Sequence, residues 1–509
     1  MKNSKKIFSV LTGATVTGAL KKPLSLLTDD SRRVIPGSCY VAVKGTQFDG
    51  HTAIAGAIEA GAVAIVAETP CTEQAQQAGV CWVQVADTRV ADGLLMSAWH
   101  GMPCRDLVTL GVTGTNGKTT ISYLTNAIFR AVWHKAGLIG TILYDDGAHR
   151  TPSHNTTPGC AELQSMLADM VNNGCRAVAM EVSSHALHQH RTTGTEFRVG
   201  IFTNLTQDHL DYHGTMEEYY EAKKQLFTRM AANKEVKGTA VINVDDEYGR
   251  RLAEELRPIM KVRTFGTAKD ADFRAEPKIV SLKGSQYELV YNNKSYLVRT
   301  PLIGEFNLSN SLAALAGAVA AGVNIRDAIS ALAQSPQVPG RMELVSSVNN
   351  VQCFVDYAHT PDAVENVCRT MKQLCRQGRV FTVFGCGGDR DRTKRPLMGE
   401  AAARYSDVCI VTSDNPRSEN PEAIIDEIMP GIPKEKQHRI TDREEAIRAA
   451  LQLARPGDCI LIAGKGHENY QIFADETITF SDSAVVTKYY EELNPEGRSV
   501  PSRKPEGKK

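Results

Sequence analysis

Short apolar runs alternate with amphipathic stretches along most of the chain, a pattern typical of a parallel sheet covered by helices. Near the start, apolar runs at residues 39–45 and 63–68 predict strands, and residues 53–62 between them predict a helix. The turn-rich segment DDSRRVIPGS precedes the first of these strands. We therefore expect residues 1–106 to form a small α/β domain.

A second series of strands begins at residues 107–113, where the run LVTLGVT leads into the glycine-rich GTNG and then into a helical pattern over residues 119–133. Further strands are predicted at residues 177–184, 199–205 and 238–246, with helical stretches between them. We expect residues 107–337 to form a central nucleotide-binding sheet domain of the P-loop type.

The segment SPQVPG, at Ser335 to Gly340, interrupts the pattern. After it, strands are predicted at residues 353–359, 379–385, 407–414 and 459–466, with helical runs between them. This pattern favours a doubly wound, Rossmann-like C-terminal domain over residues 338–493. Residues 494–509 are polar, basic and rich in Pro and Gly, so we expect a disordered tail.

Charge and cysteine content narrow the class of protein. Among 509 residues, 58 basic side chains balance 58 acidic ones, so we expect neither nucleic acid nor a membrane surface as a partner. The twelve cysteines form no C-x-x-C pair, which favours reduced thiols and a cytoplasmic location. Lysines precede an apolar stretch within residues 1–20, but Ser, Thr and Gly interrupt it, and we do not expect a signal peptide.

The loop GTNGKTT has the composition that ATP phosphates require. Gly114 and Gly117 free the backbone to turn its N–H groups inward, Lys118 supplies a cation and Thr119 supplies a hydroxyl for magnesium. The usual G-x-x-x-x-G-K-[ST] pattern is not met, because its first position falls on Val112. The strand before the loop and the helix after it favour a variant phosphate loop over a glycine-rich turn with a chance lysine.

An acidic side chain is expected at the end of a neighbouring strand, where it would bind the same magnesium ion. Glu181, in the run AMEVSSH, fits this position. Taken alone, a glutamate that ends a strand is usually a solvated surface group.

A lysine continues the apolar stripe of one predicted helix. Thr215 and Glu218 have capping-box spacing, so a helix should begin there. Its stripe includes Tyr219, Tyr220 and Leu226, and Lys223 occupies the position between them.

A lysine facing a dry interior tends towards the neutral amine, which can react with carbon dioxide to give a metal-binding carbamate. Alternatively, Lys223 extends its ammonium to water or pairs with Asp208 or Asp211. Just upstream, His209 lies among polar residues and is either a ligand of a second metal ion or a surface group.

Several motifs together resemble one family. The chain carries, in order, GVTGTNGKTT, HNTTP, MEVSSHAL, TNLTQDHLDYHG, the AK of Lys223, GEFNLSN, PGRME, DYAHTPD and GCGGDRDRTKR. Their order and spacing resemble the Mur ligases, over the span from Asp30 to Glu468. Within that family, the chain is similar to the type that adds a diamino acid to UDP-N-acetylmuramoyl-L-alanyl-D-glutamate.

The resemblance implies a set of binding residues for each small-molecule substrate. The N-terminal domain would bind the UDP-sugar through Ser31, Thr46, Gln47 and Phe48. The muramoyl dipeptide would contact Asn155, Thr156, Thr157, Ser183, Gln189 and Arg191. ATP would bind the loop residues Gly114, Thr115, Asn116, Gly117, Lys118, Thr119 and Thr120 and lie between the central and C-terminal domains, with Asn307, Arg341 and Asp356 holding adenine, phosphate and ribose respectively.

The resemblance also implies the chemistry. The γ-phosphoryl group would pass to the D-glutamyl carboxylate to give an acyl phosphate, which the incoming amine attacks to form an amide. Mg²⁺ would be held by Thr119, Glu181, His209 and a carbamate on Lys223, formed from carbon dioxide. Lys118 would stabilise the transferring group.

The choice of amino acid is expected to depend on the DNPR sequence at Asp414, Asn415, Pro416 and Arg417. An arginine matches a carboxylate through two parallel hydrogen bonds, and meso-diaminopimelate carries a distal carboxylate that lysine lacks. Arg390, Gly464 and Glu468 complete the matching positions, with Glu468 suited to the distal ammonium. Outside this context, Arg417 would be a surface arginine after a turn proline.

Other functions share part of these features. An L-lysine-adding ligase or a folylpolyglutamate synthetase-like ligase would use the same phosphate loop. A P-loop ATPase that acts as a switch or motor would need an arginine finger or a nucleic-acid motif, and none stands out. A binding module without catalysis would not need both metal and phosphate elements. We expect an ATP-dependent ligase that acts as a monomer on small molecules.

Overall fold

The computed structural model describes residues 4–46, 48–282 and 284–493. The predicted tail, residues 494–509, and Gln47 therefore lie outside the described residues. The chain divides into two compact units. The first contains residues up to 278 together with residues 286–300 and 307–335, and the second contains residues 279–285, 301–306 and the chain from residue 336 onward. The domain limits expected at 106/107 and 337/338 stay predictions.

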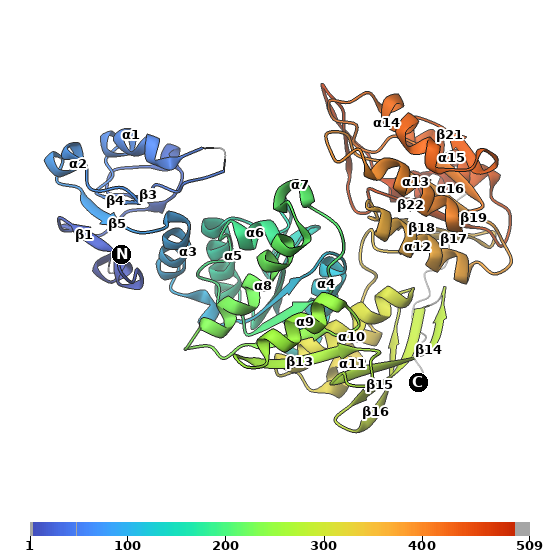
Figure 1. The fold of residues 1–509 in the computed structure, drawn as a ribbon, viewed down its shortest axis with the longest axis horizontal. Coiled ribbons are helices and arrows are strands. Elements are labelled where there is room, and N and C mark those ends of the chain that lie inside the picture. Colours follow the sequence, from blue (N-terminus) through green and yellow to red (C-terminus); the bar gives the residue numbers. More distant parts are fainter. Residues whose placement is uncertain (1–3, 47, 283, 494–509) are drawn as a thin grey trace. The chain divides into compact units, whose positions relative to one another are not determined.

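The first unit opens with a five-stranded sheet in the order β1-β5-β4-β3-β2 (Figure 1). Its strands are β1 Thr15–Thr17, β2 Leu27–Thr28, β3 Cys39–Val41, β4 Ala64–Ala67 and β5 Cys81–Gln84. Its helices are α1 Ile54–Glu59, α2 Glu73–Gln77 and α3 Thr88–Trp99, with 3₁₀ turns at Ser4–Val10, Ser31–Arg33 and Gly50–Ala53. Cys39 and Val41 face one apolar cluster and Tyr40 faces another, so both faces of the sheet are covered.

The same unit contains most of an eleven-stranded sheet, in the order β16-β15-β14-β13-β12-β11-β6-β10-β7-β8-β9. The strands are β6 Val108–Thr113, β7 Ala136–Ile139, β8 Leu143–Asp145, β9 Arg150–Pro152, β10 Ala177–Glu181, β11 Val199–Phe202, β12 Thr239–Asn243, β13 Lys261–Gly266, β14 Phe273–Ser281, β15 Gly284–Tyr291 and β16 Lys294–Thr300. The middle strands, from β7 to β14 in this order, pair in parallel, whereas β8 and β9 are antiparallel.

Helices cover both faces of this sheet. They are α4 Lys118–Trp133, α5 Cys160–Asn172, α6 Ser184–His188, α7 Leu210–His213, α8 Met216–Ala232, α9 Glu247–Leu256, α10 Glu305–Ala320 and α11 Ile325–Ala333. The apolar sides of α5, α8 and α9 pack on one face through Leu163, Phe227 and Leu252. On the other face α10 approaches so closely that a Cβ at Gly317 would lie 2.6 Å from Cδ1 of Ile201. Parallel strands that are buried on both faces consist of continuous apolar runs. This explains why these strands could be predicted from the sequence.

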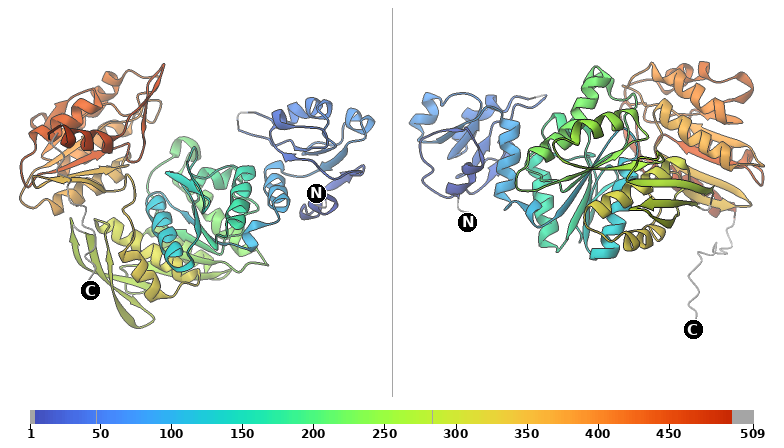
Figure 2. Two further views of the ribbon diagram at one scale, coloured as in Figure 1. Left: turned by 180° about the vertical axis from the view of Figure 1, so that it is seen from behind. Right: turned by 60° about the horizontal axis from the view of Figure 1, so that its bottom comes forward.

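The second unit is built on a six-stranded sheet, in the order β17-β18-β22-β19-β20-β21, which Figure 2 shows in two further views. Its strands are β17 Glu343–Val348, β18 Val351–Asp356, β19 Val380–Phe384, β20 Val408–Val411, β21 Gln437–Arg439 and β22 Cys459–Ala463, and β23 Tyr470–Ile472 pairs with β24 Thr477–Thr479 as a separate hairpin. The helices are α12 Pro361–Leu374, α13 Lys394–Tyr405, α14 Pro421–Ile428, α15 Arg443–Leu453 and α16 Asp482–Leu493. Short 3₁₀ turns lie at Met429–Gly431 and Lys434–Lys436 in this unit and at Pro103–Arg105 in the first unit.

Alternate residues of the central strand β22 show how this sheet is layered. Leu461 faces the apolar cluster of α12, α13 and α14, whereas Ile460 and Ile462 face the cluster of α15 and α16. All pairings except β17 with β18 are parallel in this sheet. The doubly wound arrangement expected from the sequence is confirmed.

Two further features bear on the class of protein. No helix among the described residues combines the length and apolar character that crossing a membrane requires. All twelve cysteines are free thiols, and eleven of them are buried, with Cys71 partly exposed.

Candidate active site

The phosphate loop joins the end of β6 to the start of α4. Gly114 and Gly117 have φ values of +145° and +90°, which residues with a side chain rarely adopt. A Cβ at Gly114 would overlap the hydroxyl of Thr203, and one at Gly117 would overlap the side-chain oxygen of Asn310. Both glycines are therefore required by backbone conformation and by space. Helix α4 begins directly after the loop, and the N–H groups at a helix N-terminus are suited to bind an anion.

Two lysines converge on this loop. Lys118 donates hydrogen bonds from Nζ to the carbonyl oxygens of Gly114, at 3.1 Å, and Thr115, at 2.9 Å. Lys223, from the middle of α8, donates to the same Gly114 oxygen at 2.8 Å. The carbonyl of Gly114 thus brings together two amines that are 105 positions apart in the sequence, by the difference of their numbers.

Lys223 is buried rather than extended to water. Its side chain is 1% exposed, and Nζ lies 4.3 Å from the centre of the Tyr219 ring. Burial, reinforced by the charge of Lys118, lowers the pKa of Lys223 well below its usual range, and Asp208 opposes this shift. The alternative in which Lys223 reaches solvent is therefore wrong. A lowered pKa favours the neutral amine, which is the form that carbamate formation requires.

Helix α8 places Lys223 because its start is fixed. Thr215 is the N-cap, and its hydroxyl accepts a hydrogen bond from the backbone N–H of Glu218 at 3.2 Å. From this start, Tyr219, Lys223, Leu226 and Phe227 all fall on the buried side. The helix start and the apolar stripe predicted from the sequence are confirmed.

Glu181 ends β10 beside the phosphate loop, because the parallel register pairs it with Val112 of β6. Its carboxylate is fully buried and accepts a hydrogen bond from the hydroxyl of Thr119 at 3.0 Å. Thr141 adds its backbone N–H at 2.8 Å and its hydroxyl at 3.1 Å. A hydroxyl and a carboxylate at this separation are hard oxygen ligands of the type that Mg²⁺ prefers. Thr119 and Glu181 therefore suit a shared cation.

His209 lies at the edge of this region, at the start of α7, with a left-handed backbone (φ +55°). Its ring centre is 4.9 Å from that of His185. The His209 side chain is 45% exposed, and the partial desolvation of its ring lowers its pKa, which favours the neutral imidazole that binds metals. Within the described ranges, no group of three or more His, Cys, Asp or Glu side chains is arranged to hold a metal ion by itself. A site here would have to include the Thr119 hydroxyl or a modified Lys223.

The residues matched to the muramoyl dipeptide form one hydrogen-bonded group next to Glu181. Arg191 donates from Nη1 to the carbonyl of Thr157 at 3.1 Å and from Nη2 to the side-chain oxygen of Gln189 at 2.7 Å. The Thr157 hydroxyl donates to the carbonyl of Glu181 at 2.9 Å and accepts from the backbone N–H of Ser183 at 3.1 Å.

Two more members of this set lie close by. The hydroxyls of Thr156 and Thr141 are 3.0 Å apart, and the carbonyl of Asn155 accepts a hydrogen bond from Tyr144 at 2.6 Å. Thr141 also contacts Glu181, so it joins the predicted dipeptide residues to the predicted metal ligand. Residues predicted from three separate motifs are therefore neighbours in the structure.

The N-terminal residues lie around one turn of the small sheet. Ser31 begins the 3₁₀ turn Ser31–Arg33, and its side chain contacts the hydroxyl of Tyr40. Thr46 and Phe48 lie in the loop between Lys44 and Asp49, and Phe48 is 59% exposed. An exposed aromatic ring on a loop is available to a ligand.

Asn307 is buried in the first turns of α10, where its side-chain oxygen accepts a hydrogen bond from Asn310 at 2.9 Å. Asn310 also contacts the phosphate loop at Gly117. Asn307 is therefore linked to the loop through Asn310.

The other two residues matched to ATP belong to the second unit. Asp356 ends β18, and its carboxylate accepts hydrogen bonds from the backbone N–H groups of Met342 and Ala358, each at 2.7 Å. Burial raises the pKa of Asp356, and the nearby Arg341 opposes this shift. The guanidinium of Arg341 stacks 4.5 Å from the ring of Tyr357.

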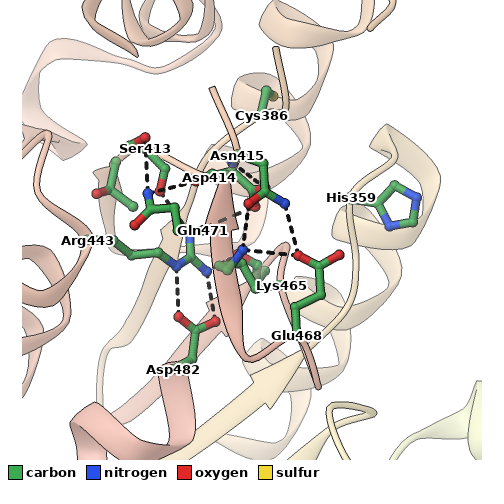
Figure 3. A network of polar contacts seen from close by, with 12 residues as sticks. His359, Cys386, Ser413, Asp414, Asn415, Arg443, Lys465, Glu468, Gln471 and Asp482 are labelled. Carbon is green, nitrogen blue, oxygen red and sulfur yellow. Dashed lines mark hydrogen bonds and ion pairs between the residues drawn. The ribbon is translucent and has the colours of Figure 1, made fainter. Parts of the chain in front are cut away.

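Three of the residues matched to the amino-acid substrate, Asp414, Asn415 and Glu468, lie just beyond the carboxyl ends of β20 and β22 (Figure 3). Asn415 donates from Nδ2 to Glu468 Oε2 at 2.9 Å. Gly464 has φ +114°, and a Cβ there would lie 2.5 Å from the carboxylate of Asp414. Ligands of doubly wound sheets bind at this end of the strands, where the strand order reverses.

Arg417 has a left-handed backbone (φ +53°) after Pro416. Its backbone N–H donates to the carbonyl of Ile472 at 3.0 Å, and Nη1 donates to the carbonyl of Gly388 at 2.8 Å. Arg390 is exposed, and its stem lies near Gly387, which the Arg417 guanidinium also approaches. The two arginines therefore flank the same glycine pair.

Several residues at these sites were missed by the sequence analysis. Thr141 touches the predicted residues only because the fold brings it there, and it stands in no recognisable motif. Asn310 ends the GEFNLSN motif, from which only Asn307 was assigned. The fully buried Arg395 donates to Glu419 and Glu427, and its Nη2 also donates to the carbonyl of Gly387 at 3.4 Å in the preceding loop. Lys465 lies between Gly464 and Glu468, both of which were assigned from the sequence, so its position was the available signal.

Family models match three stretches of the chain. These are the Mur ligase family, catalytic domain, over residues 24–100; the Mur ligase middle domain, over residues 112–318; and the Mur ligase, glutamate ligase domain, over residues 340–466. Together they cover more than half of the chain. The chain belongs to the Mur ligase family. The expected α/β fold class with three domains is confirmed.

Several relatives carry the same name. The UDP-N-acetylmuramoyl-L-alanyl-D-glutamate--2,6-diaminopimelate ligase of Syntrophomonas wolfei is 43% identical over 475 residues, which are 92% of this chain and 95% of the relative. The enzyme of the same name from Geobacillus thermodenitrificans is 44% identical over 486 residues, 94% of this chain and 97% of the relative. A solved structure of a ligase of that name is 34% identical, with a TM-score of 0.69, and the match covers 93% of this chain and 96% of that one.

More distant structures share the fold. The folylpolyglutamate synthase of Mycobacterium tuberculosis, complexed with ADP and AMPPCP, is 18% identical, with a TM-score of 0.61, and the match covers 80% of this chain and 94% of that one. Its lower identity and coverage make it a relative in fold alone.

Proposed function

We propose that this chain is an ATP-dependent amide ligase that adds meso-diaminopimelate to UDP-N-acetylmuramoyl-L-alanyl-D-glutamate, a step in making the peptidoglycan precursor. The names of its relatives support the activity, since two of them are at least 43% identical over more than nine tenths of this chain. The structural observation that carries the proposal is the hydrogen-bonded link from Thr119 through Glu181 to Thr157 and Arg191. This link joins the phosphate loop to the residues proposed for the dipeptide.

The reaction begins with an acid that is a poor electrophile. We propose that the γ-phosphoryl group of ATP passes to the D-glutamyl side-chain carboxylate, with ADP as the leaving group. Lys118, at the phosphate loop, would neutralise charge that develops on the transferring oxygens. Arg191 would hold the dipeptide by its carboxylate, because its guanidinium is already oriented by Gln189 and Thr157.

In the second step the amine of the diamino acid attacks the acyl carbon, the C–N bond forms, and inorganic phosphate leaves. The amine loses one proton in the step, and no side chain in the described site is assigned as the base. Product formation thus consumes one ATP and releases ADP and phosphate.

Thr119, Glu181 and His209 would hold Mg²⁺, together with a carbamate on Lys223. The fit rests on the 3.0 Å separation of the Thr119 hydroxyl and the Glu181 carboxylate, and on the lowered pKa of Lys223. Bound Mg²⁺ would offset the repulsion between the substrate carboxylate and the triphosphate. Carbamate formation would convert the Lys223 amine from a hydrogen-bond donor into an anionic oxygen ligand.

The second unit supplies the proposed amine site. Arg417 would bind the distal carboxylate of meso-diaminopimelate, and Glu468 and Asn415 would bind its ammonium and carboxylate groups near by. L-lysine has no distal carboxylate, so the Arg417 fork would stay unpaired with that substrate. We propose that the enzyme acts as a monomer in the cytoplasm, which suits a reaction on ATP and the set of free thiols.

The test measures phosphate release with ATP, Mg²⁺ and UDP-N-acetylmuramoyl-L-alanyl-D-glutamate, adding meso-diaminopimelate, L-lysine or no amine in parallel. The proposal expects release that depends on meso-diaminopimelate and a product of matching mass. Equal release in all three reactions would exclude a ligase. A preference for L-lysine would overturn the role given to Arg417 and favour the lysine-adding alternative.

A further inference from the structure

One lysine in the proposed amine site has no exposed side-chain surface at all. Lys465, two residues after the end of β22, is 0% exposed. Its ammonium donates to Asn415 Oδ1 at 3.0 Å and to Glu468 Oε2 at 3.0 Å, and it lies 5.5 Å from the centre of the Tyr470 ring. A buried ammonium that is fully enclosed in this way cannot reach a substrate, so any role it has must act through its two partners.

The first partner is the amide of Asn415, whose orientation the contacts determine. Its oxygen accepts hydrogen bonds from Lys465 and from the backbone N–H of Ile472, at 3.0 Å each. Its nitrogen donates to Glu468 at 2.9 Å. Turning the amide over would place its NH₂ group against two donors and its oxygen against a carboxylate, and each of these three contacts would become repulsive.

The second partner is the carboxylate of Glu468, of which only one oxygen accepts hydrogen bonds from the protein. Oε2 accepts from both Lys465 and Asn415, and Oε1 accepts no hydrogen bond from the residues that the structure describes. Figure 3 shows Oε1 turned away from both donors. The Glu468 side chain is 13% exposed, so this second oxygen lies near the surface of the site rather than in the core.

A second buried ion pair in the same view provides a comparison. Arg443 and Asp482 are both 0% exposed, and the two oxygens of Asp482 are taken by Nε and Nη2 of Arg443, at 2.7 and 2.8 Å. Both oxygens of Asp482 are thus occupied, while Nη1 of Arg443 lies 4.0 Å from the carboxylate of Asp414. The contact between Lys465 and Glu468 differs, because Oε1 of Glu468 accepts no hydrogen bond from the described residues and is available to a ligand.

We propose that Lys465 is a positioning residue for the amine substrate: it orients Asn415 and turns Glu468 so that Oε1 accepts a hydrogen bond from an ammonium group of the incoming diamino acid. This inference rests on the proposed function. Lys465 does not contact the substrate.

The test compares Lys465→Met with the full-length wild-type enzyme, varying ATP, UDP-N-acetylmuramoyl-L-alanyl-D-glutamate and meso-diaminopimelate in turn. We expect the KM for meso-diaminopimelate to rise by about 10- to 100-fold, which is the effect of losing a hydrogen bond to a charged group. The KM values of the other two substrates should stay within about twofold, because their proposed sites do not include these residues. Lys488→Met, the same change at a lysine that is 61% exposed, is the matched control.

A double-mutant cycle separates positioning from a general loss of structure. Glu468→Gln alone should also raise the KM for meso-diaminopimelate, and adding Lys465→Met to it should have little further effect, because the target of Lys465 is already altered. The double variant leaves no unpaired buried charge, so it also keeps the test possible if Lys465→Met alone folds poorly. Additive effects, or an equal rise in all three KM values, would overturn the inference.

The wild-type reaction distinguishes this inference from the proposed function. If the wild-type enzyme uses L-lysine and not meso-diaminopimelate, the proposed substrate is wrong. The same cycle is then run with L-lysine, whose distal ammonium would still need an acceptor. Coupling between Lys465 and Glu468 would support the positioning role in either case, and its absence would refute it.

Discussion

The carbonyl oxygen of Gly114 accepts hydrogen bonds from two amines, those of Lys118 and Lys223. Two ammonium groups so close together repel each other, and the more buried of them gives up its charge more readily. This accounts for the depressed pKa of Lys223, for which burial is the larger cause and Lys118 the second. The lysine proposed for modification is thus made reactive mainly by its burial, and the lysine proposed for phosphate transfer adds to this effect.

Lys223→Ala should lower ligase activity by about 100-fold or more, since it removes a proposed metal ligand at the site of phosphoryl transfer. Bicarbonate should not restore activity, whereas a short carboxylic acid such as acetate should restore part of it by occupying the space. Phosphate release measures both.

The neighbouring Lys224→Ala is the control for this substitution. Lys224 pairs with Glu221 and Glu255 on the outer side of the same helix, so its loss should leave activity nearly unchanged. Full activity in Lys223→Ala would refute the role given to that lysine.

His213 makes folding stability depend on pH. It is 7% exposed, its Nε2 lies 2.9 Å from the Ser184 hydroxyl, and burial lowers its pKa to about 4. An unfolded histidine takes up a proton near pH 6.5, so between pH 6.5 and 4 the unfolded chain binds more protons than the folded one. Stability should therefore be complete above pH 6.5 and decline as the pH falls towards 4.

Urea unfolding at a series of pH values measures this effect. His213→Gln, which cannot titrate, should show a shallower loss of stability over the same window than the wild-type protein. Identical slopes for the two proteins would show that His213 does not contribute.

At the scale of elements, α8 is the helix whose start decides where a functional lysine falls. Thr215→Ala removes the hydroxyl that accepts from Glu218 and should reduce the free energy of unfolding by about 1 kcal/mol. Urea unfolding measures the change. Thr215→Ser keeps the acceptor and should behave like the wild-type protein, and a loss of the same size in Thr215→Ser would mean that the cap is not the cause.

The strands that were predicted correctly share one property, which is burial on both faces. Strands β6, β10, β11 and β12, and likewise β18, β19, β20 and β22, are apolar runs in the sequence because helices cover both sides of them. β17 was missed because none of its six residues is fully buried, so no apolar run marks it. The antiparallel additions β8 and β9 were missed because they are three residues each.

The candidate site divides in a similar way. Loop residues such as Gly114 and Lys118 could be assigned because backbone conformation and charge restrict the residue types at those positions. Lys223 was noticed because it broke an apolar stripe. Thr141 could not be predicted, because its role comes from long-range contacts that leave no local pattern in the sequence. Asn310 lies in the GEFNLSN motif, but its contact with Gly117 is set by the fold.

At the scale of the whole molecule, the two compact units need not unfold in one step. The buried pair of Arg443 and Asp482 lies within the second unit, where Arg443 also binds the carbonyl of Ala463 at 3.0 Å. It therefore ties α15 and α16 to the end of β22. Removing one partner leaves an uncompensated buried charge, which typically costs about 3–5 kcal/mol.

Asp482→Ala should therefore destabilise the second unit selectively. All three tryptophans, at positions 82, 99 and 133, belong to the first unit, so tryptophan fluorescence follows that unit alone. We expect the heat-capacity transition of the second unit to move to lower temperature in the variant, while the fluorescence transition stays in place. Equal shifts in both signals would mean that the two units unfold together.

The thiols of the chain carry a further consequence. Six cysteines lie in each unit, and of the twelve only Cys71 is partly exposed in the fold. A small alkylating reagent added to the native protein should therefore modify Cys71 first and the others only when the surrounding unit opens. Peptide mass spectrometry after timed labelling would assign each opening event to its unit, and substrates that close a site would slow the labelling of the thiols beneath it.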